Sequence, residues 1–148
     1  MLKSLFKLFT TKRKTRSHII RIQGAHYNLK EIYDRLNAQY FEGKLLLAIT
    51  WVSPKKTKYR RRILLGSFHP HLKLIKVNRL LDTAETPPYF IDFIVYHEML
   101  HFVLPPIFQK NRSRQIHHRA FKEQEKKFQQ YALAKAYREK SKGTWFVD

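Results

Sequence analysis

The chain has 148 residues, 43% of them hydrophobic, which is enough for one domain with a single core. Its 30 Lys and Arg against 11 Asp and Glu give a formal net charge of +19, so we expect contact with a polyanion, with nucleic acid ahead of a membrane surface. Because the sequence contains no cysteine, disulfides, thiolate metal sites and cysteine nucleophiles are excluded, and any metal ion must be held by His or carboxylate side chains.

The N-terminal residues 1–18 are basic, and the like charges of residues 10–18 predict a flexible tail. We expect one domain over 19–140 and a C-terminal tail over 141–148. The apolar residues among the lysines of 2–9 would allow weak contact with a membrane surface, but a frayed basic terminus is the simpler interpretation. No segment approaches the ~20 apolar residues that cross a bilayer, so we expect a soluble, cytoplasmic protein.

Helical spacing of apolar residues begins after Asn28. The pattern predicts a helix over 29–41, with Asn28 placed to cap its start and Gly43 to end it. Residues 45–52 are rich in apolar and β-branched side chains, which predicts a strand, and the polar, basic residues 53–58 predict a loop.

Two further short apolar runs, over 63–68 and 72–77, flank His69-Pro70-His71. This composition and spacing are typical of two strands joined by a hairpin turn. We therefore expect a small, mostly antiparallel sheet.

Prolines bracket the next predicted helix. Residues 89–104 contain no Gly or Pro and are nearly all apolar, so they should form a buried helix. Residues 105–116 lack periodicity, and an amphipathic pattern then predicts one last helix over about 117–139. Together the elements indicate an α+β fold.

The buried helix carries the sequence His97-Glu98-Met99-Leu100-His101. Since a helix turns about 100° per residue, His97 and His101 share one face and can bind one metal ion, with Glu98 beside them as a base. Leaving such buried polar groups unpaired would cost about 1–3 kcal/mol each, and a metal site satisfies all of them. The alternative is a set of hydrogen-bonded side chains at the edge of the core with no ion. The pattern favours a zinc hydrolase, in which Glu98 takes a proton from a zinc-bound water.

A catalytic zinc ion normally has three protein ligands, so a third ligand is needed. His117 and His118 are the best candidates, and only one should bind because their side chains point about 100° apart on a helix. The other histidines are weaker candidates: His18, His26, His69 and His71.

Several stretches between residues 28 and 130 are distinctive together: Leu36–Leu45, Ile49–Trp51, Leu65–Phe68, Ile75–Asn78, Tyr96–His101 and His117–Phe121. They resemble the SprT-like metallopeptidases, the family that includes the Spartan-type proteases. In that family the third zinc ligand is a histidine followed four residues later by an aromatic residue. Phe121 satisfies this relation for His117, and no aromatic residue satisfies it for His118.

The resemblance implies a minimal zincin-like domain, in which a small sheet packs against the active-site helix and neighbouring helices. It implies one Zn²⁺ per chain held by His97, His101 and His117, with Glu98 as the catalytic base. It also implies protein substrates, often proteins on DNA. The family often has Gly and an acidic residue where this chain has His118 and Ala120.

Clustered cations indicate a surface for sequence-independent contact with nucleic acid. The candidate residues follow the predicted strand over 45–52: Lys55, Lys56, Lys58, Arg60, Arg61 and Arg62. A second cluster flanks His117 and is equally consistent with a solvated rim: Lys110, Arg112, Arg114 and Arg119. Lys122, Lys126 and Lys127 alternate with Glu123 and Glu125, which is typical of an ordinary solvent-facing side of a helix.

We therefore expect a zinc-dependent metallopeptidase that hydrolyses protein or peptide substrates, including proteins associated with nucleic acid. An edge strand would align an extended peptide. Two alternatives stay open. One is a metal-dependent nuclease, because the same chemistry attacks phosphate. The other is a non-catalytic, basic nucleic-acid-binding protein with a structural metal site, for which Glu98 would be dispensable.

Overall fold

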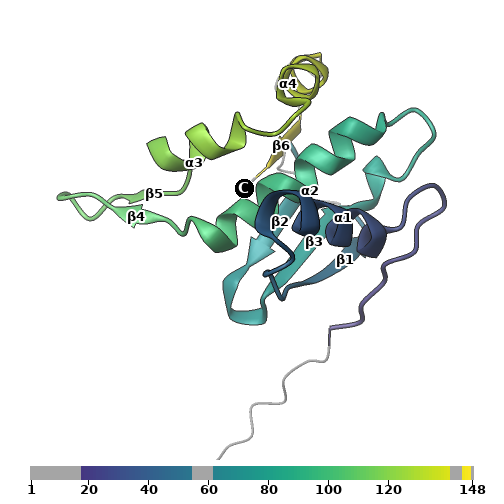
Figure 1. The fold of residues 1–148 in the computed structure, drawn as a ribbon, viewed down its shortest axis with the longest axis horizontal. Coiled ribbons are helices and arrows are strands. Elements are labelled where there is room, and N and C mark those ends of the chain that lie inside the picture. Colours follow the sequence, from purple (N-terminus) through teal and green to yellow (C-terminus); the bar gives the residue numbers. More distant parts are fainter. Residues whose placement is uncertain (1–17, 55–61, 141–144, 148) are drawn as a thin grey trace, which may run out of the picture.

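The computed structural model describes residues 18–54, 62–140 and 145–147. These residues form four α-helices, a four-stranded mixed sheet and a short two-stranded hairpin (Figure 1). The expected α+β class is confirmed. The tail predicted over 1–18 lies, apart from His18, outside the described residues.

Helix α1 spans Leu29–Phe41, the bounds predicted from the sequence. The Asn28 side chain accepts hydrogen bonds from the backbone N–H groups of Lys30 at 2.9 Å and Glu31 at 3.2 Å. These bonds satisfy two of the donors that the start of a helix leaves open. The helix ends where Glu42 and Gly43 both adopt positive φ, 55° and 69°.

The main sheet contains four strands in the order β1-β3-β2-β6. They are β1 (Ala48–Val52), β2 (Ile63–His69), β3 (Leu74–Asn78) and β6 (Trp145–Val147). The β2–β3 pair is antiparallel and is joined by a 3₁₀ turn at Pro70–Leu72, as the predicted hairpin requires. The β1–β3 and β2–β6 pairs are parallel. The prediction of a mostly antiparallel sheet is therefore wrong, because apolar runs identify strands without fixing the direction of distant neighbours.

Strand β6 lies in the stretch expected to be a C-terminal tail. Its backbone pairs with β2 in the register Ile63 with Trp145, Leu64 with Phe146 and Gly66 with Val147. The composition of β6 is aromatic and β-branched, which is typical of strands. This stretch therefore contributes an edge strand to the sheet.

Helix α2 spans Pro88–Val103 and forms the centre of the core. It begins at the proline, where a missing N–H costs nothing. Every residue from Phe90 to His101 is buried, as expected for a helix that is apolar nearly all round. Among its buried polar residues, Asp92 forms an ion pair with Arg35 at 2.8 Å. The others belong to the site described below.

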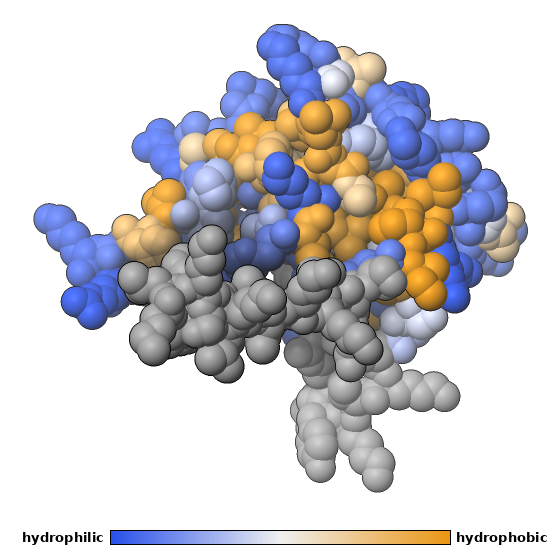
Figure 2. All heavy atoms as spheres, turned by 90° about the horizontal axis from the view of Figure 1, so that it is seen from below, coloured by the Kyte–Doolittle hydropathy of each residue, from blue (hydrophilic) through white to orange (hydrophobic). Residues whose placement is uncertain are grey.

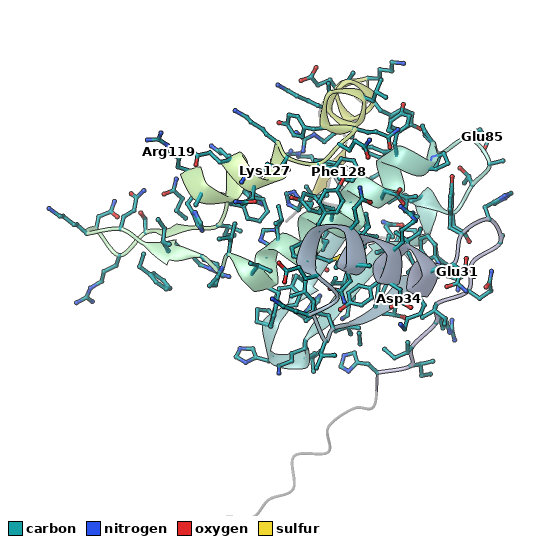
Figure 3. The ribbon with its side chains drawn as sticks, viewed as in Figure 1. Glu31, Asp34, Glu85, Arg119, Lys127 and Phe128 are labelled. Atoms are coloured by element: carbon teal, nitrogen blue, oxygen red, sulfur yellow. The ribbon has the colours of Figure 1, made fainter. Side chains whose placement is uncertain are left out.

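The single helix predicted over 117–139 is wrong, because the structure divides it into α3 (Arg119–Glu125) and α4 (Tyr131–Glu139). The turn between them carries Phe128, which is 4% exposed and lies between α4 and the helices below it (Figure 3). Its ring centroid lies 5.4 Å from that of Tyr96 in α2. The break thus allows an aromatic side chain from the turn itself to fill the core.

A hairpin connects α2 to α3 where the sequence indicates an aperiodic loop. Its antiparallel strands are β4 (Ile107–Phe108) and β5 (Arg114–Gln115). The hairpin projects from the body of the molecule (Figure 1). The histidines of the candidate site lie on both sides of this connection: His97 and His101 in α2 before it, and His117 just before α3.

None of the helices in the described part of the chain is long and apolar enough to span a membrane. On the face shown in Figure 2, apolar residues lie among hydrophilic ones. The exposed large apolar side chains of the described residues include Ile19, Leu46 and Phe108.

Asp82 fixes the segment that precedes α1. Its carboxylate accepts hydrogen bonds from the backbone N–H groups of Ala25 at 2.6 Å, His26 at 2.9 Å and Tyr27 at 3.1 Å. A Cβ atom at Gly24 would lie 2.4 Å from this carboxylate, so a side chain there would displace Asp82. Burial alone would raise the pKa of Asp82. The three hydrogen bonds outweigh this effect, and the net pKa lies below its ordinary value.

Candidate metal centre

Two imidazoles project from one face of α2. His97 and His101 are 2% and 7% exposed, and their Nε2 atoms lie 3.2 Å apart. The helical spacing of four residues brings both rings to the same side, as the sequence predicts.

The third imidazole comes from the segment that enters α3. The Nε2 atom of His117 lies 3.2 Å from that of His97 and 3.4 Å from that of His101. Nitrogen ligands about 2.0–2.1 Å from a tetrahedral zinc ion are about 3.3–3.4 Å from one another. Among the described residues, these three histidines form a group that could hold a metal ion, and their nitrogen separations fit one ion.

The ring of His97 is held from its other side by Glu125, the last residue of α3. The Oε1 atom of Glu125 lies 2.8 Å from His97 Nδ1. Burial alone would raise the pKa of Glu125. The hydrogen bond from His97 and the charges of His97, Arg138 and His117 lower the pKa by more than burial raises it. The net pKa of Glu125 lies below its ordinary value.

The Phe121 side chain packs against all three imidazoles. Its ring centroid lies 5.0 Å from that of His97, 4.7 Å from that of His101 and 4.9 Å from that of His117. Phe121 is fully buried, so the wall it forms is apolar. A rigid apolar wall limits the rotation of the rings and keeps water from that side of the site.

Glu98 lies beside the histidines and is fully buried. Its Oε2 atom is 4.0 Å from Nε2 of His101. The carboxylate packs against strand β2 at Gly66, where an added Cβ would lie 2.8 Å from Glu98 Oε1. The missing side chain at Gly66 therefore provides the space that the Glu98 carboxylate occupies.

His118 does not join the cluster. Its ring acts at the start of α3, where Nδ1 accepts a hydrogen bond from the Phe121 backbone N–H at 3.4 Å. Its Nε2 lies 3.1 Å from the carbonyl oxygen of Pro105. Of the two adjacent histidines, the structure thus brings only His117 to the site and gives His118 the role of a helix cap.

The described basic residues lie on the surface. Of the predicted nucleic-acid contacts, Arg62 is exposed beside the start of β2. The other five lie outside the described residues: Lys55, Lys56, Lys58, Arg60 and Arg61. The second cluster is also exposed, on the β4–β5 hairpin and the start of α3: Lys110, Arg112, Arg114 and Arg119.

Sequence reasoning missed two residues of this site. Glu125 is placed on a solvent-facing side by the charge pattern around it, yet it is buried against His97. The spacing of four residues from His117 to Phe121 and again to Glu125 was the available signal for a shared face. Gly66 had a weaker signal, because a glycine inside a strand often marks a close approach.

Comparison of the chain with protein-family models, with curated proteins and with solved structures gives no match.

Proposed function

We propose that this chain is a zinc-dependent peptidase of the SprT-like kind, with one Zn²⁺ held by His97, His101 and His117. The observation that carries the proposal is the convergence of three Nε2 atoms, 3.2 to 3.4 Å apart, beside the buried Glu98. Three histidine ligands leave a coordination position open, which is typical of catalytic zinc sites, whereas structural sites are closed by four protein ligands.

A zinc ion in this site would lower the pKa of a water molecule and polarise a substrate carbonyl. In this proposal, Glu98 accepts the proton of the attacking water and returns it to the leaving amine. Its position relative to the ligands is set by α2, since Glu98 follows His97 directly in the same helix. Its close approach to Gly66 restricts the carboxylate on the side of strand β2.

The proposed substrates are protein or peptide chains, and proteins bound to nucleic acid are the expected subset. The formal net charge of +19 supports this choice, because it attracts polyanions without any need to read a sequence. A nuclease would use the same ligands and the same base. A binding protein with a structural metal ion would not need Glu98, so the substrate and the role of Glu98 decide between the three.

The metal content of the purified full chain tests the site. Elemental analysis should find about one zinc per chain in the wild type and in His118→Ala, and little in His117→Ala. His118→Ala is the matched control, because it removes an adjacent imidazole that caps α3 without touching the cluster. A wild type that binds no zinc, even when zinc is supplied, would contradict the proposal.

Turnover tests the chemistry. Zinc-loaded wild type and Glu98→Gln are compared on an unfolded protein substrate, with and without DNA, and on labelled nucleic acid alone. We expect proteolysis by the wild type and its loss in Glu98→Gln at unchanged zinc content, since Glu98 is not a ligand. Cleavage of nucleic acid alone would identify a nuclease, and cleavage of neither substrate would leave the binding protein as the better account.

A further inference from the structure

Glu125 is buried beside a proposed ligand although it belongs to a short, charged helix. It is 9% exposed, and its Oε1 atom lies 2.8 Å from Nδ1 of His97. Glu123, two residues earlier in α3, is exposed and pairs with Arg119 at 2.9 Å. The two glutamates therefore have different environments, and only Glu125 lies in the site.

The contact determines which nitrogen of His97 can bind a metal ion. A neutral imidazole carries one proton, on either Nδ1 or Nε2, and only the nitrogen without the proton can act as a ligand. A carboxylate only accepts hydrogen bonds, so Glu125 favours the proton on Nδ1. The lone pair of Nε2 is then directed at the Nε2 atoms of His101 and His117, 3.2 Å away in both cases.

Helix α3 supplies this acceptor, and the segment that enters it supplies the third histidine. His117, Phe121 and Glu125 are spaced by four residues, so the segment brings a ligand, an apolar wall and a carboxylate to the same site. Phe121 packs against the ring of His97 at 5.0 Å, which limits the orientations open to that ring. The orientation of a ligand from α2 is thereby tied to the placement of α3.

We propose that Glu125 is a positioning residue, which holds the proton of His97 on Nδ1 and so presents Nε2 to the metal ion. This inference rests on the proposed zinc site. Hydrogen bonding of a ligand's second nitrogen to a carboxylate fixes its tautomer and ring orientation and raises its basicity. If the pair only stabilised the fold, zinc affinity would not depend on Glu125.

The test measures the zinc affinity of the full chain by competition with a chromophoric chelator, for wild type, Glu125→Gln, Glu125→Ala and Glu123→Gln. Glu125→Ala should bind zinc about 10–100-fold more weakly. Glu125→Gln should lose less, because the amide oxygen can still accept the Nδ1 proton. Glu123→Gln is the control on the same helix and should bind like the wild type.

A second readout follows the proton itself. Long-range proton–nitrogen NMR of the metal-free chain should place the His97 proton on Nδ1 in the wild type and show a mixture of tautomers in Glu125→Ala. Circular dichroism checks that each variant is folded. If Glu125→Ala does not fold, the zinc affinity of Glu125→Gln alone tests the inference. Wild-type affinity in the Glu125 variants would overturn the inference. Absence of zinc binding in wild type and Glu123→Gln would instead reject the proposed function beneath it.

Discussion

Gly66 is the residue at which strand β2 meets the proposed catalytic base. A Cβ atom at this position would lie 2.8 Å from Oε1 of Glu98 and 3.0 Å from Cγ2 of Ile94. Both atoms belong to α2, which is buried on all sides at this level, so the helix has little room to move away. Glycine is needed here because a side chain approaches closely.

Gly66→Ala should therefore displace Glu98. We expect the proposed peptidase activity to fall about 10–100-fold, because a small misplacement of the proposed base would be costly. The free energy of unfolding should fall by about 1–3 kcal/mol from overpacking. Zinc content should stay the same, since Glu98 is not a ligand. Turnover, urea unfolding and elemental analysis provide the three measurements.

Ser67→Ala is the control for this change, because neighbouring side chains of a strand point to opposite faces. It should keep the activity of the wild type. Full activity in Gly66→Ala would show that the position of Glu98 does not depend on the space at residue 66.

The site residues differ in how far local sequence could reveal them. His97, Glu98 and His101 lie within one turn of one helix, so their proximity follows from helix geometry alone. The spacing alone did not decide whether His117 or His118 is the third ligand. In the structure only His117 lies in the cluster, because the ring of His118 caps α3. Glu125 was missed because the lysines around it resemble a solvated face, whereas its burial depends on packing against α2.

Helices and strands likewise differ in whether local sequence or tertiary packing determines them. Signals for the start and end of helices are local, and they gave α1 its bounds and α2 its bounds to within a residue. Strand pairing is not local, so the parallel β1–β3 and β2–β6 pairs were not predicted. The break between α3 and α4 was missed for a related reason, because it depends on the packing of Phe128 in the core.

Asp82 joins the 3₁₀ turn at Arg79–Leu81 to the segment before α1, and its contribution should depend on pH. Asp82→Ala should lower the free energy of unfolding by about 0.5–1.5 kcal/mol near neutral pH, because three backbone N–H groups lose their acceptor and two of them are exposed to water. The pKa of Asp82 is lowered by folding, so its stabilising effect is present above the unfolded pKa and is lost as pH falls through the folded pKa.

Urea unfolding of both proteins over a series of pH values checks this prediction. The difference in unfolding free energy should be largest near neutral pH and should shrink in acid, as the wild-type carboxyl group becomes protonated. Asp34→Ala is the control, since Asp34 is exposed and its ion pair with Lys30 runs along the same helix. A difference that does not change with pH would contradict the assigned role of the Asp82 carboxylate.

The candidate metal centre connects α2 to the segment entering α3. Its ligands come from both sides of the projecting hairpin, so they converge only in the folded chain. An ion that binds the folded chain and not the unfolded one stabilises it by mass action. The stabilisation is about 4 kcal/mol when free zinc exceeds its dissociation constant about 1,000-fold.

Zinc should therefore raise the melting temperature of the wild type, and a chelator should reverse the rise. His117→Ala should show a much smaller rise, because it lacks the ligand that comes from outside α2. Calorimetry of both proteins with and without zinc measures the effect. Equal shifts in the two proteins would mean that zinc binds elsewhere on the chain.

The pairing of β6 with β2 has a consequence for the order in which the molecule folds. The β2–β3 hairpin joins neighbouring segments and can form within microseconds. Strand β6 reaches β2 only after the helices that separate them in the chain, and closing so long a loop costs more entropy. The three histidines are closer together in sequence than β6 and β2. We therefore expect that a nascent chain can take up the proposed zinc ion before its sheet is complete.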